Sequence, residues 1–514
     1  MSARAQTVLG FFVFTLAVYI LSAPGRIDSI DGQTRYEVTQ NLVSFGEPVL
    51  RDPWLAGGGV PGLEGKRYSF YNASPSLAAY PLVWLGGQFD DPQAEKRRFL
   101  FSLTTAFFGA GLAALLVLFW TDLGVPLRRA AGWSAVHAFA TLAWPASTTV
   151  LDQVQQGFWV LLAAWLVFRA ARQRSVLLAV GGCLALAVLI NHQPNFVLLV
   201  PTLALAGLSP PAATAERRTP RWAIPAVFLL GAPLGIGLSF YYNIIRFGTP
   251  FFLDRLNELG DQPPFFGSPI DGLLGLLFSP GKSILLYSPV VLLAVAGWFA
   301  LRRRWKWLAW AAAGTFLMQL VFTAFLSFWH GDWCWGPRYL MVVLPLVSLG
   351  LAFLDLAGWK KGAAYGLIAA GLGVQLLGLG VVHERFFFEN RQLNWPRPGH
   401  YFHVSAWLTR PGEVWQIVTE GPPAEAVQFA PTPYPETETY YITGVLPDED
   451  PVEWMRGYQV FYRLRPWTFW LPTLPPKERP VPFALPLIAL LLTAAGGGAL
   501  AARGLRRAGQ AAAP

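Results

Sequence analysis

The sequence has little cysteine, little charge and little histidine, and each scarcity narrows the class of protein. The chain of 514 residues has two cysteines. Cys183 lies in an apolar run and Cys334 in a polar segment between two such runs, so we expect no disulfide framework. No His/Cys cluster has the spacing of zinc ligands. Charged residues make up 13% of the chain, well below the roughly 25% of a soluble domain. A Rossmann fingerprint is also lacking, so no nucleotide-binding domain is indicated.

Long apolar runs take the place of charge. Hydrophobic residues make up 54% of the chain, in runs near the roughly 20 residues that a helix needs to cross a bilayer. Such runs must be helical, because the hydrocarbon offers the backbone no partner. The predicted fold is an all-α polytopic membrane protein with about twelve spans, near 6–24, 98–121, 131–147, 157–171, 175–190, 193–208, 222–245, 284–301, 306–328, 338–356, 363–383 and 481–502. Residues 191–195 are either a turn or a kink. The first run lacks a convincing cleavage site and is interpreted as a retained helix.

The basic residues indicate the orientation of the spans. They lie in short loops between alternate spans, as at 128–129, 302–304 and 360–361, whereas the segments 148–157 and 191–195 carry no Lys or Arg. By the positive-inside rule both termini are expected in the cytoplasm, in a multi-pass protein of the plasma (inner) membrane. The net charge of +9 therefore implies membrane lipids as partners and no nucleic acid.

This orientation places four larger segments outside: 25–97, 246–283, 329–337 and 384–480. We expect a membrane module at 1–383 with outer loop 25–97, an extracytoplasmic segment at 384–480, and a last helix with a cytoplasmic tail at 481–514. The segment 384–480 has strand-like pieces at 440–445 and 458–464, so a small α+β or irregular outer cap is predicted there.

Ionisable residues collect where the outer segments meet the spans, and few lie at midspan. They are Asp28, Asp31, Arg35, Asp152, Asp254, Asp271, Lys282, His330, Asp332 and Arg338. A transporter tends to place such residues near the bilayer midplane and to show internal repeats. The pattern instead indicates one polar site at the outer membrane interface, as an enzyme acting on a lipid-linked substrate needs.

Asp31 is the first candidate within this site. Residues 33–45 have helical character with an apolar side, which predicts a helix lying along the membrane. Asp31 would then be the N-cap residue, and this structural role accounts for it without any chemistry. The functional alternative is a partly desolvated carboxylate with a raised pKa, suited to act as a general base.

Several motifs together resemble one family of membrane enzymes. The first outer segment carries Asp31 and TRYEVTQNLVSFGEPVL at 34–50, and then YNASPSLAAYPLVWLGG at 71–87. Further stretches are LAWPASTTVLDQVQQGFWVLLAAWLVFRA at 142–170, FYYNIIRFGTPF at 240–251, LLFSPGKSILLYSPVVLL at 276–293 and WHGDWCWGPRYLMVVLPL at 329–346. In order and spacing they resemble the C-type fold (GT-C) glycosyltransferases, close to the protein O-mannosyltransferases and the lipid A aminoarabinose transferase. The resemblance covers about residues 1–383. The chain departs from it at Gly32, where relatives often have the second acid of an Asp-Glu pair.

The resemblance implies a glycosyltransferase that uses a polyprenyl-phosphate sugar on the outer face of the membrane. Asp31 would be the general base, and Asp152 would orient the acceptor, assist the base or help to bind a metal. Lys282 and Arg338 would bind the phosphate, since Arg suits bidentate contact and Lys acts as a point charge. Arg35, His330 and Asp332 are further substrate-binding candidates. The acceptor is a lipid, glycan or protein. A divalent metal is left open, and no other cofactor is implied.

The charged candidates have plain structural alternatives. Asp152 would cap the fourth span. Lys282 and Arg338 would snorkel to headgroups from the outer starts of their spans. His330 and Asp332 lie in a tryptophan-rich loop that is typical of an aromatic belt.

Three further polar residues, and the function itself, also carry alternatives. His137 is expected to be a core histidine, whereas Asn191 and His192 face the outer side near the site. The main functional alternative is a non-enzymatic transporter or flippase of a lipid-linked sugar. A catalytically inactive scaffold of the same fold is a third.

Overall fold

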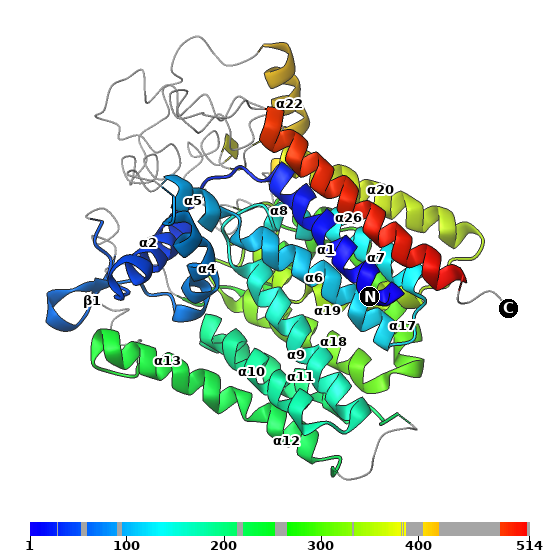
Figure 1. Ribbon diagram of the computed structural model, residues 1–514, viewed down its shortest axis with the longest axis horizontal. Coiled ribbons are helices and arrows are strands. Elements are labelled where there is room, and N and C mark those ends of the chain that lie inside the picture. Colours follow the sequence, from blue (N-terminus) through cyan, green and yellow to red (C-terminus); the bar gives the residue numbers. More distant parts are fainter. Residues whose placement is uncertain are drawn as a thin grey trace.

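The regular secondary structure of the described part of the chain is helical apart from one short hairpin (Figure 1). The computed structural model describes residues 1–510 except 28, 53–58, 90–94, 213–218, 252–264, 332–333, 382, 384, 387–404 and 421–483. The hairpin joins β1 (Val60–Pro61) to β2 (Arg67–Tyr68) in antiparallel register. The all-α prediction is confirmed, while the strand-like pieces at 440–445 and 458–464 fall outside the described residues.

Seven helices of this described part are long and apolar enough to cross a membrane. The elements that form them are α1 (Ala3–Ser22), α5 (Glu95–Ser102) with α6 (Thr104–Asp122), α9 (Gln153–Gln173), α12 (Ala223–Leu229) with α13 (Gly231–Phe247), α18 (Lys306–Phe325), α20 (Trp359–Gly380) and α26 (Ala484–Gln510). The chain is therefore a multi-pass membrane protein.

The other expected spans are shorter or broken helices. They are α7 (Leu127–Ala140), α8 (Ala143–Ala146), α10 (Val176–His192), η2 (Pro194–Leu199), α11 (Val200–Ala204), η3 (Leu205–Leu208), α16 (Ile284–Tyr287), α17 (Val290–Arg304), η5 (Arg338–Val342), α19 (Leu344–Val347) and η6 (Ser348–Phe353). Proline explains several breaks, since it has no N–H and clashes with the preceding turn. Helical structure thus overlaps each expected span, and the count of twelve stays a prediction.

Residues 191–195 form a turn rather than a kink. Helix α10 ends at His192, and Gln193 is extended before η2 begins. The chain then runs back toward the end of α9. A hydrogen bond shows this: the backbone N–H of Ala212 donates to the carbonyl of Arg172 at 2.8 Å. Arg172 lies in the last turn of α9, at the opposite end of the helices from His192.

Two tryptophans, the buried Trp120 and the partly buried Trp298, support the irregular span formed by η5, α19 and η6. Its 3-10 turns leave carbonyls without the partners of a regular helix. The indole N–H of Trp120 donates to Leu349 O at 3.1 Å, and that of Trp298 donates to Val347 O at 3.0 Å. These side chains stabilise a span that propensity alone would not.

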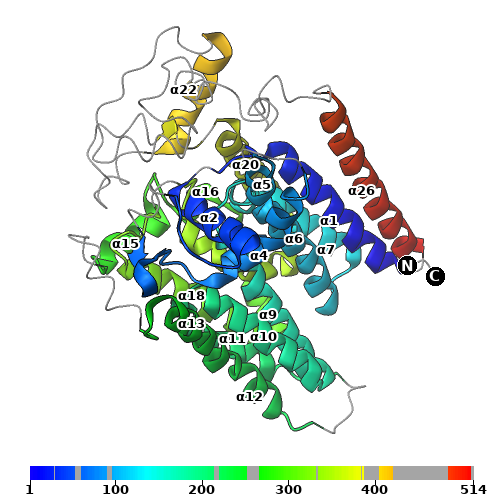
Figure 2. The same cartoon turned by 60° about the vertical axis from the view of Figure 1, so that its left-hand side comes forward.

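Helices α1 and α26 lie side by side, with the start of α1 beside the end of α26 (Figures 1 and 2). Glycines allow the close approach: a Cβ on Gly497 would lie 2.6 Å from the Phe14 nitrogen, and one on Gly504 would lie 2.6 Å from the Ala3 carbonyl. This contact closes the helical bundle on one side.

The remaining described elements lie in the expected outer segments. They are α2 (Ile30–Phe45), η1 (Leu63–Gly65), α4 (Ala73–Gly86), α15 (Pro269–Phe278) and α22 (Ala406–Thr419). Helix α2 packs against α4, and Tyr36 and Val38 on it are buried. The helix predicted over 33–45 therefore exists and begins three residues earlier.

Candidate functional site

The start of α2 places Asp31 in the first helical turn. Ser29 is the N-cap, and its hydroxyl accepts a hydrogen bond from the Gly32 N–H at 3.1 Å. The expectation that Asp31 caps this helix is wrong, because the helix begins at Ile30 and its N-cap is Ser29. The Asp31 carboxylate projects from the helix N-terminus, where a negative charge is favoured by the helix dipole.

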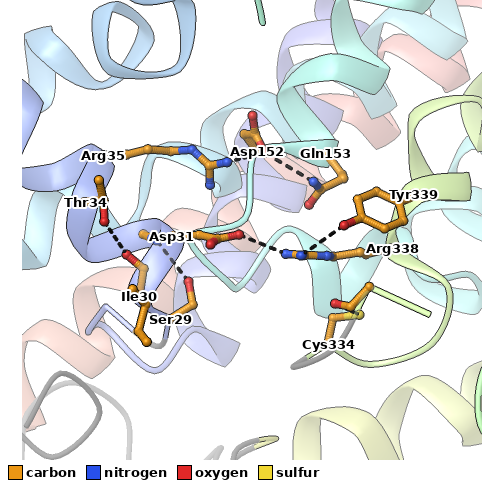
Figure 3. Close-up of polar contacts among 12 residues, drawn as sticks. Ser29, Ile30, Asp31, Thr34, Arg35, Asp152, Gln153, Cys334, Arg338 and Tyr339 are labelled. Carbon is orange, nitrogen blue, oxygen red and sulfur yellow. Dashed lines mark hydrogen bonds and ion pairs between the residues drawn. The ribbon is translucent and has the colours of Figure 1, made fainter. Parts of the chain in front are cut away.

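Asp31 forms an ion pair with Arg338, which is 307 residues away in the sequence. Arg338 Nη1 lies 3.3 Å from Asp31 Oδ2, and the two side chains are 16% and 32% exposed. Figure 3 shows them directed toward each other from α2 and η5. Arg338 Nη2 also lies 3.3 Å from the Tyr339 hydroxyl. Asp31 is thus held in place and still reachable from outside.

One turn further along α2, Arg35 is paired with Asp152 in the interior. Nη2 of Arg35 lies 3.2 Å from Oδ1 of Asp152, and the side chains are 4% and 2% exposed (Figure 3). Asp152 also accepts hydrogen bonds from the amides of Gln153 at 3.2 Å and Gln156 at 2.9 Å. His192 Nδ1 lies 3.7 Å from its other oxygen.

Asp152 occupies the N-cap position of α9, but its side chain makes no capping hydrogen bond. Burial alone would raise the pKa of this carboxyl. The charge of Arg35 and the bond to His192 outweigh burial and hold the pKa below its usual range. Asp152 therefore remains ionised. It pairs with Arg35 and does not cap the helix.

Tyr71 joins the two ion pairs into one cluster. Its ring lies under the Arg35 guanidinium, 4.1 Å from ring centroid to Cζ, and its hydroxyl is hydrogen-bonded to Asp31. Burial and the neighbouring Asp31 charge raise the pKa of Tyr71 well above its ordinary value. Tyr71 is therefore a protonated donor to Asp31 across the physiological pH range.

Lys282 supports the loop before Arg338 instead of reaching headgroups. The side chain is buried, and Nζ donates to Cys334 O at 2.8 Å and to Gly336 O at 3.4 Å. Gly336 has φ +71°, a conformation that glycine adopts without strain. The loop can thus turn sharply just before Arg338.

The remaining predicted residues are His330 and Asp271, together with others outside the described residues. His330 is buried and contacts the Trp329 ring, with centroids 5.6 Å apart. Asp332, like Asp28 and Asp254, is outside the described residues. Asp271 lies in the first turn of α15, whose N-cap is Ser268.

His137 is a buried core residue as expected, with Nδ1 2.8 Å from the Ser348 hydroxyl. No group of three or more His, Cys, Asp or Glu side chains that could hold a metal ion occurs among the described residues.

Sequence reasoning missed the residues that connect the candidates. Tyr71 stands inside one of the quoted motifs but had no charge to mark it. Gln153 and Gln156 follow Asp152 at spacings of one and four, which places all three at the start of one helix. That spacing was a usable signal for a hydrogen-bonded carboxylate.

The described part of the molecule is thus an all-α polytopic membrane protein with a polar cluster at one end of its helices. No protein-family model matches the chain, and no curated protein matches it in sequence. Among solved structures, ArnT from Cupriavidus metallidurans bound to undecaprenyl phosphate is similar, with a TM-score of 0.47 and 12% identity over 97% of this chain and 77% of ArnT. The oligosaccharyltransferase AglB from Archaeoglobus fulgidus, in complex with an inhibitory peptide and a dolichol-phosphate, has a TM-score of 0.42 and 12% identity over 88% and 63%.

These neighbours include ArnT, the lipid A aminoarabinose transferase that the sequence motifs resemble. At 12% identity the likeness concerns the fold alone. No residue role, substrate or partner of this chain follows from it.

Proposed function

We propose that the protein is a glycosyltransferase that moves a sugar from a polyprenyl-phosphate carrier to an acceptor hydroxyl on the outer face of the plasma membrane. The observation that carries the proposal is the Asp31 carboxylate, which is accessible and held between Arg338 and Tyr71. Behind it the Arg35–Asp152 pair is buried. A reacting carboxylate needs this combination of access and fixed orientation.

Asp31 would act as the general base. The acceptor hydroxyl attacks the anomeric carbon of the sugar, and the bond from that carbon to the phosphate oxygen breaks. The acceptor proton passes to Asp31, and the polyprenyl phosphate leaves with the bonding electron pair. A phosphate leaving group needs cations more than a strong acid.

Arg338 and Arg35 would supply positive charge to the phosphate. Arg338 is 16% exposed and can offer its planar fork to an anion. A phosphate at Arg338 competes with Asp31 for the same guanidinium, which would free the carboxylate for the acceptor proton. Within the described residues, Nε and Nη1 of the buried Arg35 have no hydrogen-bond partner. Such donors are costly when unsatisfied and favour a polar ligand nearby.

Asp152 and Lys282 would have supporting roles. Asp152 is 2% exposed at its side chain and fully engaged by its neighbours. We assign it to hold Arg35 and not to touch the acceptor. Lys282 would likewise fix the loop before Arg338.

The outer location is supported by the opposite end of the helices, which is basic. There Arg4 pairs with Asp122 at 2.7 Å, and Arg169 lies 3.5 Å from the same carboxylate. Arginines on the side away from the cluster fit a cytoplasmic face with both termini on it.

Asp31→Asn tests the proposal directly. The purified variant should lose about 10²- to 10⁴-fold of its transfer rate, the usual contribution of a general base, while folding and membrane insertion persist. The assay offers a panel of polyprenyl-phosphate sugars with lipid, glycan and peptide acceptors.

Asp271→Asn is the matched control, since Asp271 also lies in the first turn of a serine-capped helix. It should transfer sugar at the wild-type rate. Full activity of Asp31→Asn would remove Asp31 from the mechanism. Movement of the labelled lipid-linked sugar across a liposome membrane without any transfer would favour the flippase alternative.

A further inference from the structure

Arg246, at the end of α13, is deeply buried, although no carboxylate of the described residues forms an ion pair with it. It is 1% exposed. Its guanidinium packs on the Tyr242 ring, with Cζ 3.8 Å from the ring centroid. Burying a guanidinium costs desolvation free energy, which hydrogen bonds from its N–H groups must offset.

The donors of Arg246 hold the backbone on both sides of Phe70. Nη1 donates to the carbonyls of Ser69 and Tyr71, the latter at 3.1 Å. Nε donates to Tyr242 O at 3.1 Å, and Nη2 donates to the Asn243 side-chain oxygen at 2.9 Å. The two bonds within α13 fix the guanidinium, and its remaining nitrogen clamps the Ser69–Tyr71 segment.

The same segment carries the tyrosine that contacts Asp31 and Arg35. The Tyr71 N–H donates to the Ser69 hydroxyl at 3.0 Å, which closes the turn. Tyr71 stands just before Asn72, the N-cap of α4. Its backbone therefore has contacts that set where the side chain points.

The end of α13 is also docked on the first outer loop. Tyr68 packs edge-to-face on Phe247, with centroids 5.8 Å apart, and both are buried with Val49 and Val60. Asn243 donates to the Pro250 carbonyl at 3.0 Å. Arg246 thus lies in a packed junction between the end of α13 and the first outer loop. It is 175 residues from Tyr71 in the sequence.

We propose that Arg246 is a positioning residue for the reaction: through the Ser69 and Tyr71 carbonyls it sets Tyr71 against Asp31 and Arg35. Arg246 itself touches no reacting atom. This inference rests on the proposed function, because it deepens the role of that site.

Arg246→Lys keeps the charge and loses the planar fork, since an ammonium cannot reproduce bonds in fixed directions to several acceptors. Hydrogen exchange of the full-length protein in nanodiscs should show amides 69–73 exchanging about tenfold faster in the variant. Arg67→Lys is the control. Arg67 bonds one carbonyl, that of Gly59, at 2.6 Å, and its replacement should leave the exchange of 69–73 unchanged. Unchanged protection in Arg246→Lys would overturn the clamp.

A double-mutant cycle tests whether Arg246 acts through Tyr71. Arg246→Lys should lower kcat about tenfold with KM for the donor little changed. In the Tyr71→Phe background it should have almost no further effect, because coupled residues are not additive. Additive losses would refute the connection.

The hydrogen-exchange and sugar-transfer experiments test different claims, so each can fail without the other. If the wild type transfers no sugar from the panel, the proposed function fails and the exchange result still decides the clamp. If Arg246→Lys does not reach the membrane, Asn243→Ala removes the partner of Nη2 and is read by the same exchange.

Discussion

Replacing Arg35 by methionine should expose how much the interior of the site depends on one ion pair. The substitution keeps most of the side-chain volume and removes the charge. At the observed 3.2 Å, the attraction is about 5 kcal/mol for an effective dielectric of about 20. Removing one partner of a buried pair leaves the other charge uncompensated and costs about 3–5 kcal/mol. We therefore expect Arg35→Met to be destabilised by about that amount.

A surface pair of almost the same length is the control. Arg51 lies 3.1 Å from Glu47, but the side chains are 47% and 42% exposed. An exposed pair contributes about 1 kcal/mol or less, so Arg51→Met should change stability little. Denaturant titration followed by tryptophan fluorescence compares the two. Equal stabilities of both variants would refute the buried geometry.

The wild type and Arg35→Met should also differ in the direction in which their stability changes with pH. In the wild type the folded-state pKa of Asp152 lies below its unfolded value. The stabilisation is therefore complete above about pH 4, the unfolded value, and is lost as the pH falls from there through the lower folded-state pKa. Without Arg35, burial raises the pKa of Asp152, so Arg35→Met should recover stability from pH 8 to pH 5. Burial lowers the pKa of His192, the other titratable group at this carboxylate, so the recovery is assigned to Asp152 and not to His192. The double variant Arg35→Met/Asp152→Asn should be more stable than Arg35→Met at pH 8 and still inactive.

Two further substitutions test the bundle and the loop. Gly497→Leu should destabilise the protein by about 1–3 kcal/mol, because a Cβ there meets the Phe14 backbone. Gly496 faces open space, so Gly496→Leu should leave the stability unchanged in the same titration. Lys282→Met should lower the transfer rate and make amides 334–336 exchange faster, since it removes the donor to Cys334 O; normal exchange in that segment would contradict the supporting role.

The multi-pass helical fold and the grouping of charged residues at one end of the helices were predictable, because hydropathy and charge placement act over whole segments. The pairing within the site was not. Nothing local tells which acid Arg338 meets, since Asp31 is 307 residues away. The helix start was misjudged because the sequence offers two capping residues, and Ser29 rather than Asp31 reaches the free N–H of Gly32. Tyr71 was missed because its position depends on Arg246, from a distant helix.

The contact between α1 and α26 has a consequence for biosynthesis. At about 5–20 residues per second, roughly half a minute to a minute and a half separates the synthesis of these two helices. During that interval the side of α1 that carries Gly10 and later packs on α26 faces lipid or a temporary neighbour. Helix α6, which also packs on α1, emerges early enough to hold it. Among the described helices, α26 is therefore the last to reach its partner, and the helices around the site are synthesised before the contact between α1 and α26 forms.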